Sequence, residues 1–128
     1  MIDFAEFEKI IKVEFKDKDI LKQAFTHRSY LNENRKGKIG HNERLEFLGD
    51  AVLELAVTKF LYNKYPEKPE GDLTAIRAAL VNTNTISDAA KKLKMNDFLL
   101  LSKGEAKDNG RARQYILANA FEAIIGAI

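Results

Sequence analysis

The stretch NERLEFLGDAVLELAVTKFLYNKY, residues 42–65, decides the fold. It contains one glycine and no proline, and its apolar residues recur at spacings of three and four. That period predicts a long α-helix that begins near Asn42 and ends at about Tyr65. The apolar residues on one side of this helix are Leu45, Leu48, Val52, Leu55 and Ala56. Its second half is apolar nearly all round, so we expect that half to be buried.

The same spacing elsewhere in the chain, without sustained alternation, predicts an all-α fold and one domain over residues 1–128. Further helices are expected at residues 3–13, 17–25, 72–80, 84–93 and 111–128. Two polar segments, residues 32–40 and 102–110, are expected to be loops. The chain stops inside its last apolar helix, and we therefore expect more of the domain to follow Ile128.

Composition excludes several kinds of site. The chain has 21 Lys and Arg against 19 Asp and Glu, and this net charge of +2 does not by itself indicate nucleic-acid binding. Because Cys is absent, disulfides, Cys-ligated zinc and iron–sulfur clusters are excluded. The only histidines, His27 and His41, are far apart in sequence, and we interpret both as structural. No apolar run approaches the roughly 18 residues of a membrane span, and the N-terminus lacks a signal peptide, which fits a cytoplasmic protein.

An acidic stripe runs along the long helix. Glu43, Glu46, Asp50 and Glu54 project into an arc of roughly 80°. One interpretation is a solvated acidic face. The other is a cation site, because like charges four residues apart repel each other and, when partly buried, shift their pKa values or recruit a cation.

The last helix offers a matching polar edge. Its residues from Ile116 onward are apolar except for Asn119, Glu122 and Gly126, which lie within about 60° of one another. These three residues form either an exposed edge of a core helix or the second half of the acidic site. In the latter case Asn119 and Glu122 face Glu46 and Asp50, and four oxygen-bearing side chains make a site for Mg²⁺, or for Mn²⁺ in its place.

Several blocks of sequence resemble the nuclease domain of the ribonuclease III family, of the bacterial type with a single nuclease domain. The blocks occur in the family's order and span the chain from Thr26 to its end. They are HRSY at 27–30, NERLEFLGDAVL at 42–53, EGDLT at 70–74, RAALV at 77–81, GE at 104–105, GR at 110–111 and ILANAFEAIIGAI at 116–128.

This resemblance implies an all-α homodimer whose intersubunit valley holds a double-stranded RNA substrate. Each subunit then hydrolyses one strand and leaves 5′-phosphate and 3′-hydroxyl ends with a short 3′ overhang, as in the processing of ribosomal and messenger RNA. The usual family member also carries a C-terminal double-stranded-RNA-binding domain, and nothing in this chain resembles it.

The resemblance also assigns the metal site. It implies that Glu46, Asp50, Asn119 and Glu122 bind magnesium and that Asp50 and Glu122 are catalytic. Two further acidic residues, Glu43 and Glu70, match positions that line the same valley. The family usually has Asp at the position of Asn119, and this departure leaves a second reading, a weakened or inactive relative that binds structured RNA.

Three further interpretations concern surfaces. Phe47 projects beside the acidic arc, so it either packs under a loop of its own chain or, as the resemblance suggests, fills a pocket of the partner subunit.

RNA contacts are expected from Arg111 and Arg113. The other basic loop residues are Arg35, Lys36, Lys38, Lys103 and Lys107. A plain helical interaction module with a solvated acidic face remains the rival to every catalytic reading.

Overall fold

The computed structural model describes residues 1–34 and 37–128 of the chain. Across these residues the fold is helical, as predicted. They contain no β-strand, only an isolated β-bridge between Thr26 and Leu100. The elements are α1 (Phe4–Ile11), α2 (Lys18–Ala24), α3 (Arg28–Glu33), α4 (Glu43–Lys64), α5 (Glu70–Leu80), α6 (Thr83–Lys92), the 3₁₀ helix η1 (Met95–Phe98), α7 (Lys103–Lys107) and α8 (Arg111–Ala127). In this described part of the chain, no helix combines the length and the apolar character that crossing a bilayer requires.

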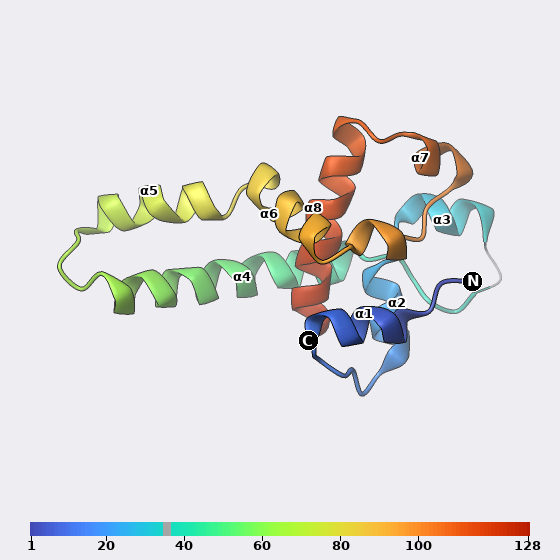
Figure 1. The fold of residues 1–128 in the computed structure, drawn as a ribbon, viewed down its shortest axis with the longest axis horizontal. Helices are drawn as coiled ribbons and strands as arrows, with labels where there is room; N and C mark the ends of the chain where they lie inside the picture. The colour runs from blue at the N-terminus through green and yellow to red at the C-terminus, as the bar shows by residue number, and fades with distance from the viewer. Residues whose placement is uncertain (35–36) are drawn as a thin grey trace.

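Helix α8 forms the centre of the fold and crosses α4 steeply (Figure 1). It packs against α4, α6 and α2, and its inner side is almost fully covered. The buried side chains there are Ile116, Leu117, Ala120, Ala123 and Ile124. Four phenylalanines, Phe4, Phe7, Phe25 and Phe98, fill the space beside α1 and α2, with ring centroids 4.8–6.4 Å apart. This core holds the α4–α8 crossing in place.

The helix starts follow local capping chemistry. The Asp17 carboxylate accepts hydrogen bonds from the backbone N–H groups of Asp19 and Ile20 at the start of α2, as N-cap residues do. Helix α5 begins at Glu70, two residues before the predicted start, because the extended backbone of Pro69 already serves as its N-cap.

Three short elements, α3, η1 and α7, were absent from the sequence prediction. Helix α7 in particular lies inside residues 102–110, which were expected to be a loop. Helices of four to six residues are unstable alone, so contacts with the rest of the fold must hold them.

The α4–α5 hairpin projects away from the rest of the molecule (Figure 1). The prediction that the second half of α4 is buried is wrong for the single chain, since Leu61 is the one buried residue there and Leu55 and Phe60 are 69% and 56% exposed. The predicted apolar side is open as well, at Leu48 and Val52. The physical reason is that beyond its crossing with α8 this part of α4 packs mainly against α5, which covers one side of it.

Candidate metal centre

Two glycines bring the backbones of α4 and α8 together. A Cβ atom at Gly49 would lie far inside van der Waals contact of the Glu122 carbonyl oxygen, and one at Gly126 would collide with the Leu45 carbonyl oxygen in the same way. Glycine is the residue that permits such a close backbone approach. The crossing therefore places residues on either side of Gly49 next to the turn of α8 that carries Glu122.

The start of α4 is fixed by its own N-cap residue. Asn42 is 5% exposed, and its side-chain amide donates a hydrogen bond of 2.9 Å to the Ala24 carbonyl. Its backbone N–H donates to the Thr26 carbonyl at 3.0 Å. These bonds tie the first turn of α4 to the end of α2 and so fix where Glu46 and Asp50 emerge.

The carboxyl groups of the two helices meet at the crossing. Burial, a hydrogen bond with Asp50 and the negative charges of Asp50 and Glu46 together raise the pKa of Glu122 to about 8. Burial, followed by repulsion from Glu43 and Asp50, also raises the pKa of the Glu46 carboxyl. Three predicted site residues from segments far apart in sequence thus form one electrostatic cluster, the acidic cluster of Glu46, Asp50 and Glu122.

The acidic cluster fits a hard divalent cation by its chemistry. Asn119 lies one turn before Glu122 on the same side of α8 and adds an amide oxygen to the carboxylates. Among the described residues, no three acidic or histidine side chains already converge as a ready-made metal site. Glu46, Asp50 and Glu122 are thus near enough to shift the pKa of Glu122, but in this conformation they do not surround one point.

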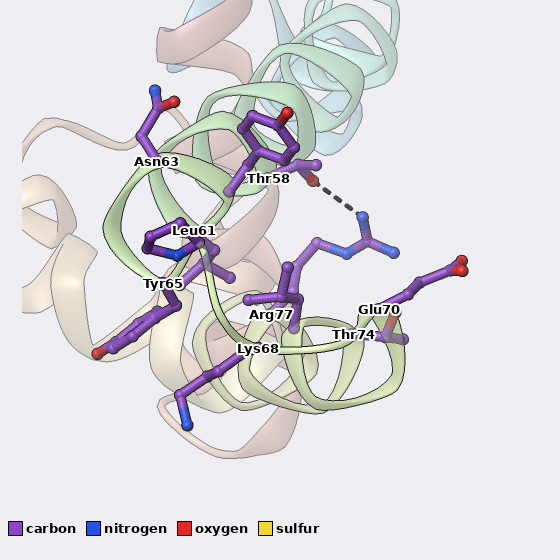
Figure 2. Close-up of a pocket in the computed structure, with 11 residues that line it drawn as sticks. Thr58, Leu61, Asn63, Tyr65, Lys68, Glu70, Thr74 and Arg77 are labelled. Carbon is purple, nitrogen blue, oxygen red and sulfur yellow. Dashed lines mark hydrogen bonds between the residues drawn. The ribbon is translucent and has the colours of Figure 1, made fainter.

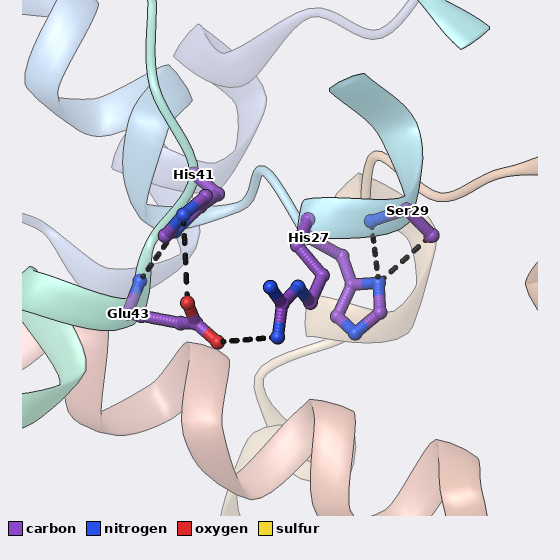
Figure 3. Close-up of polar contacts among 5 residues, drawn as sticks. His27, Ser29, His41 and Glu43 are labelled. Carbon is purple, nitrogen blue, oxygen red and sulfur yellow. Dashed lines mark hydrogen bonds and ion pairs between the residues drawn. The ribbon is translucent and has the colours of Figure 1, made fainter. Parts of the chain in front are cut away.

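Glu43 has other partners. Figure 3 shows its carboxylate reaching toward His41, with an Nε2–Oε2 distance of 3.4 Å, and Arg28 donates to its other oxygen at 3.3 Å. The Nδ1 atom of His41 accepts the backbone N–H of Glu43, and the Nδ1 atom of His27 accepts that of Ser29. Both histidines therefore organise the starts of helices, in line with the structural role that the sequence suggested.

Glu70 does not reach the acidic cluster of its own chain. It begins α5 at the tip of the hairpin, and α4 extends about 20 Å from Asp50 to its end at Lys64. Glu70 instead lines a cavity of about 580 Å³ between α4 and α5 (Figure 2). Its apolar side is formed by Leu61, Tyr62, Tyr65, Pro66 and Leu73, and its other polar lining residues are Thr58, Asn63, Lys68, Thr74 and Arg77.

The basic residues fall into two groups. Arg111, Lys38, Lys103 and Lys107 are exposed, whereas Arg113 is 7% exposed and bonded within its own chain. The expectation that Arg113 contacts RNA is therefore wrong, because a buried side chain in the first turns of α8 is not accessible to a duplex. Arg35 and Lys36 lie outside the described residues.

Phe47 lies at the surface of α4, next to Glu46. Its side chain is 83% exposed, so it does not pack under a loop of the described chain. Sequence reasoning noted Phe47 but missed the roles of Asn42 and Gly49. A glycine inside an otherwise strong helix was the available signal for a close backbone contact.

Comparison with known proteins identifies the family. A family model described as Ribonuclease-III-like matches residues 17–128. "Ribonuclease 3" of Streptococcus pneumoniae strain P1031 is 51% identical over 127 residues, which cover 96% of this chain and 55% of that protein. The chain thus spans about half the length of the curated relatives it matches.

Solved structures agree. The ribonuclease III nuclease domain from Campylobacter jejuni, described for flexibility in the region involved in its dimer formation, matches with a TM-score of 0.88 and 44% identity, over 98% of this chain and 84% of that one. Dicer from Pichia stipitis matches with a TM-score of 0.65 and 32% identity, over 89% of this chain and 45% of that one. The chain belongs to the ribonuclease III family, and its fold is that of the family's nuclease domain.

Proposed function

We propose that this chain is the nuclease domain of a magnesium-dependent, double-strand-specific endoribonuclease. It hydrolyses RNA phosphodiesters to 5′-phosphate and 3′-hydroxyl ends with short 3′ overhangs, in RNA processing. The observation that carries the proposal is the juxtaposition of Glu122 with Asp50 and Glu46 across the glycine crossing. A solvated acidic face would leave these carboxyl groups apart, because repulsion disfavours such a cluster.

The roles of the residues follow from the acidic cluster. Glu46, Asp50, Asn119 and Glu122 would hold Mg²⁺, with Mn²⁺ as a substitute. A divalent cation held there would supply charge neutralisation at the scissile phosphate and at the leaving 3′ oxygen, and would make water more acidic. Asp50 and Glu122 would accept the proton that the attacking water loses. No Ser, Cys or His nucleophile is required.

The experiment that tests this function is incubation of the protein with a long RNA duplex, with and without Mg²⁺. Short discrete products that form only with the metal support the proposal. Duplex binding without cleavage supports the second reading, a relative weakened at Asn119 that binds structured RNA. A helical interaction module would neither bind nor cut.

We also propose that the active form is a homodimer. A single acidic cluster cuts one strand, and a twofold pair supplies two. The exposed Phe47 of one copy would fill the cavity of about 580 Å³ between α4 and α5 of the other, against apolar lining residues such as Leu61 and Leu73 (Figure 2). Because Glu46 is the sequence neighbour of Phe47, seating Phe47 there would also bring Glu70, which lines that cavity, toward the acidic cluster of the other copy. On this proposal Glu70 would join the valley across the interface.

Phe47→Ala is expected to raise the dimer dissociation constant at least about 30-fold, the loss typical of a buried aromatic anchor at an interface. Thr74→Trp, which fills the receiving cavity, is expected to have a similar effect. Sedimentation over a range of concentrations measures both, with Val13→Ala as the control that removes apolar surface elsewhere. A Phe47→Ala dimer as tight as the parent would contradict the pairing.

Asn119→Asp is expected to lower the Mg²⁺ concentration for half-maximal cleavage by about tenfold, or about 1.4 kcal/mol. The added carboxylate supplies the charge that the amide lacks. Magnesium titrations of the cleavage rate measure the change. Asn32→Asp, which adds the same charge on α3, serves as the control, and equal magnesium dependence of parent and Asn119→Asp would rule out a ligand role for this position.

A further inference from the structure

Arg113 is the one charged residue in the described chain that is almost completely buried. Its Nη1 atom donates to the Asn96 Oδ1 atom at 2.6 Å, and its Nη2 atom donates to the backbone carbonyls of Glu105 and Ala106 at 2.9 and 3.1 Å. The guanidinium therefore joins α8, which carries it, to η1 and to the last turn of α7.

Helix α7 has little else to hold it. None of its five residues is buried, and a helix of this length is unstable by itself. Its other tethers are polar and act on its first residues. The Ser102 N–H donates to the Ser29 Oγ atom at 3.0 Å, and the Lys103 N–H donates to the Glu33 carboxylate at 3.2 Å. Arg113 supplies the tether at the opposite end.

The energetics favour a positional role over a general contribution to stability. No carboxylate pairs with Arg113 within residues 1–34 and 37–128, and its buried Nε atom has no partner there. The carbonyls at the C-terminal end of a helix attract a cation, but burying a charge without a counter-charge is costly, and apolar replacements at such positions are often neutral. An apolar side chain cannot replace the two hydrogen bonds that the Arg113 guanidinium donates to the carbonyls of α7.

Helix α7 presents cations. Lys103 and Lys107 are exposed on it, and Arg111 follows at the exposed start of α8. The tether from Ser29 places α7 beside α3, which follows the His27 cap near the start of α4. An ordered α7 therefore holds its two exposed lysines at fixed positions beside α3.

We propose that Arg113 is a positioning residue for RNA binding, which orders α7 so that Lys103 and Lys107 contact phosphates of the duplex. This inference rests on the proposed function. Each phosphate contact that is lost should lower the slope of log affinity against log salt by about 0.7–0.9. Loss of both lysine contacts should lower it by about 1.4–1.8.

The first test needs no RNA. In Arg113→Met, amide hydrogen exchange in residues 102–108 is expected to quicken at least tenfold, while exchange in the α4–α8 core stays unchanged. Arg113→Lys keeps the charge but not the guanidinium that donates both hydrogen bonds, so it should quicken exchange nearly as much. Arg111→Gln removes an exposed arginine two residues away and should leave exchange in α7 as in the parent.

The second test is a cycle of substitutions with a duplex RNA. Arg113→Met is expected to raise KM about tenfold with kcat within twofold, and to lower the salt slope. The double substitution of Lys103→Ala with Lys107→Ala should likewise raise KM and lower the salt slope in the parent. In the Arg113→Met background the same double substitution should change KM and the salt slope little further. Unchanged exchange in α7, or an equal cost of the lysine substitutions in both backgrounds, would overturn the proposal. A parent that neither binds nor cuts RNA would overturn the proposed function and the RNA part of this inference, whereas the exchange result would still decide whether Arg113 orders α7.

Discussion

Gly49→Ala is expected to lower the free energy of unfolding by about 3 kcal/mol or more. The new methyl group would meet the Glu122 carbonyl oxygen and the Gly126 amide, which are backbone atoms with no freedom to turn aside. The two helices must therefore separate. A displacement of about 1 Å between catalytic groups can cost about 100-fold in rate, so cleavage should fall at least that far even in molecules that remain folded.

The chain provides a matched control for this change. Gly71 lies inside α5, and a Cβ atom built there meets nothing within 4 Å. Gly71→Ala is thus expected to stabilise the protein by up to about 1 kcal/mol through helix propensity alone. Urea unfolding of both variants measures the contrast, and Gly126→Ala should resemble Gly49→Ala. If Gly49→Ala proved as stable as the parent, the close crossing of α4 and α8 would be wrong.

The prediction from sequence succeeded where the signal was local. Spacings of three and four fixed the extent of α4 to within one residue at each end. The same helical geometry placed Glu46 and Asp50 on one side of α4 and put Asn119 with Glu122 on α8. Helical geometry alone left the pairing of these two edges as one of two interpretations, because edges that both carry carboxylates repel each other unless a cation lies between them.

The prediction from sequence failed where contacts between residues far apart in the chain determine whether a side chain is buried and what it binds. Periodicity shows that α4 has an apolar side but not whether that side meets its own chain, and Leu48 and Leu55 are exposed in the monomer. Arg113 was misjudged because its position among loop cations says nothing of the carbonyls of α7 that receive it. Helix α3 was missed since its cap, the His27 ring, is an uncommon capping residue.

The second large effect concerns Glu122. Glu122→Gln is expected to lower kcat for RNA cleavage by at least about 10³-fold, because the amide retains the shape of the side chain but neither compensates a cation nor accepts a proton. The fold should persist, since the change removes the repulsion by Asp50 and Glu46. Glu14→Gln, the same substitution at an exposed residue outside the helices, is the control. A Glu122→Gln protein that cuts within tenfold of the parent would exclude Glu122 from the chemistry.

The same carboxyl links stability to pH in the metal-free protein. Its pKa of about 8 in the folded state lies above the usual 4.5, so between these values the folded state holds a proton that the unfolded state has lost. Stability is therefore greatest below the lower value and falls as the pH rises toward the higher one, by about 1–2 kcal/mol once solvent screening at this half-exposed group is allowed for. On the proposed function Mg²⁺ would compensate the ionised form, and adding it should therefore restore more stability at about pH 8 than at about pH 5. Urea unfolding of the parent and of Glu122→Gln at both pH values, with and without Mg²⁺, separates the effect of pH on the free energy of unfolding from the effect of Mg²⁺. Glu122→Gln should lose both the dependence of stability on pH and the stabilisation by Mg²⁺. If the variant kept both, the cation would bind at another site.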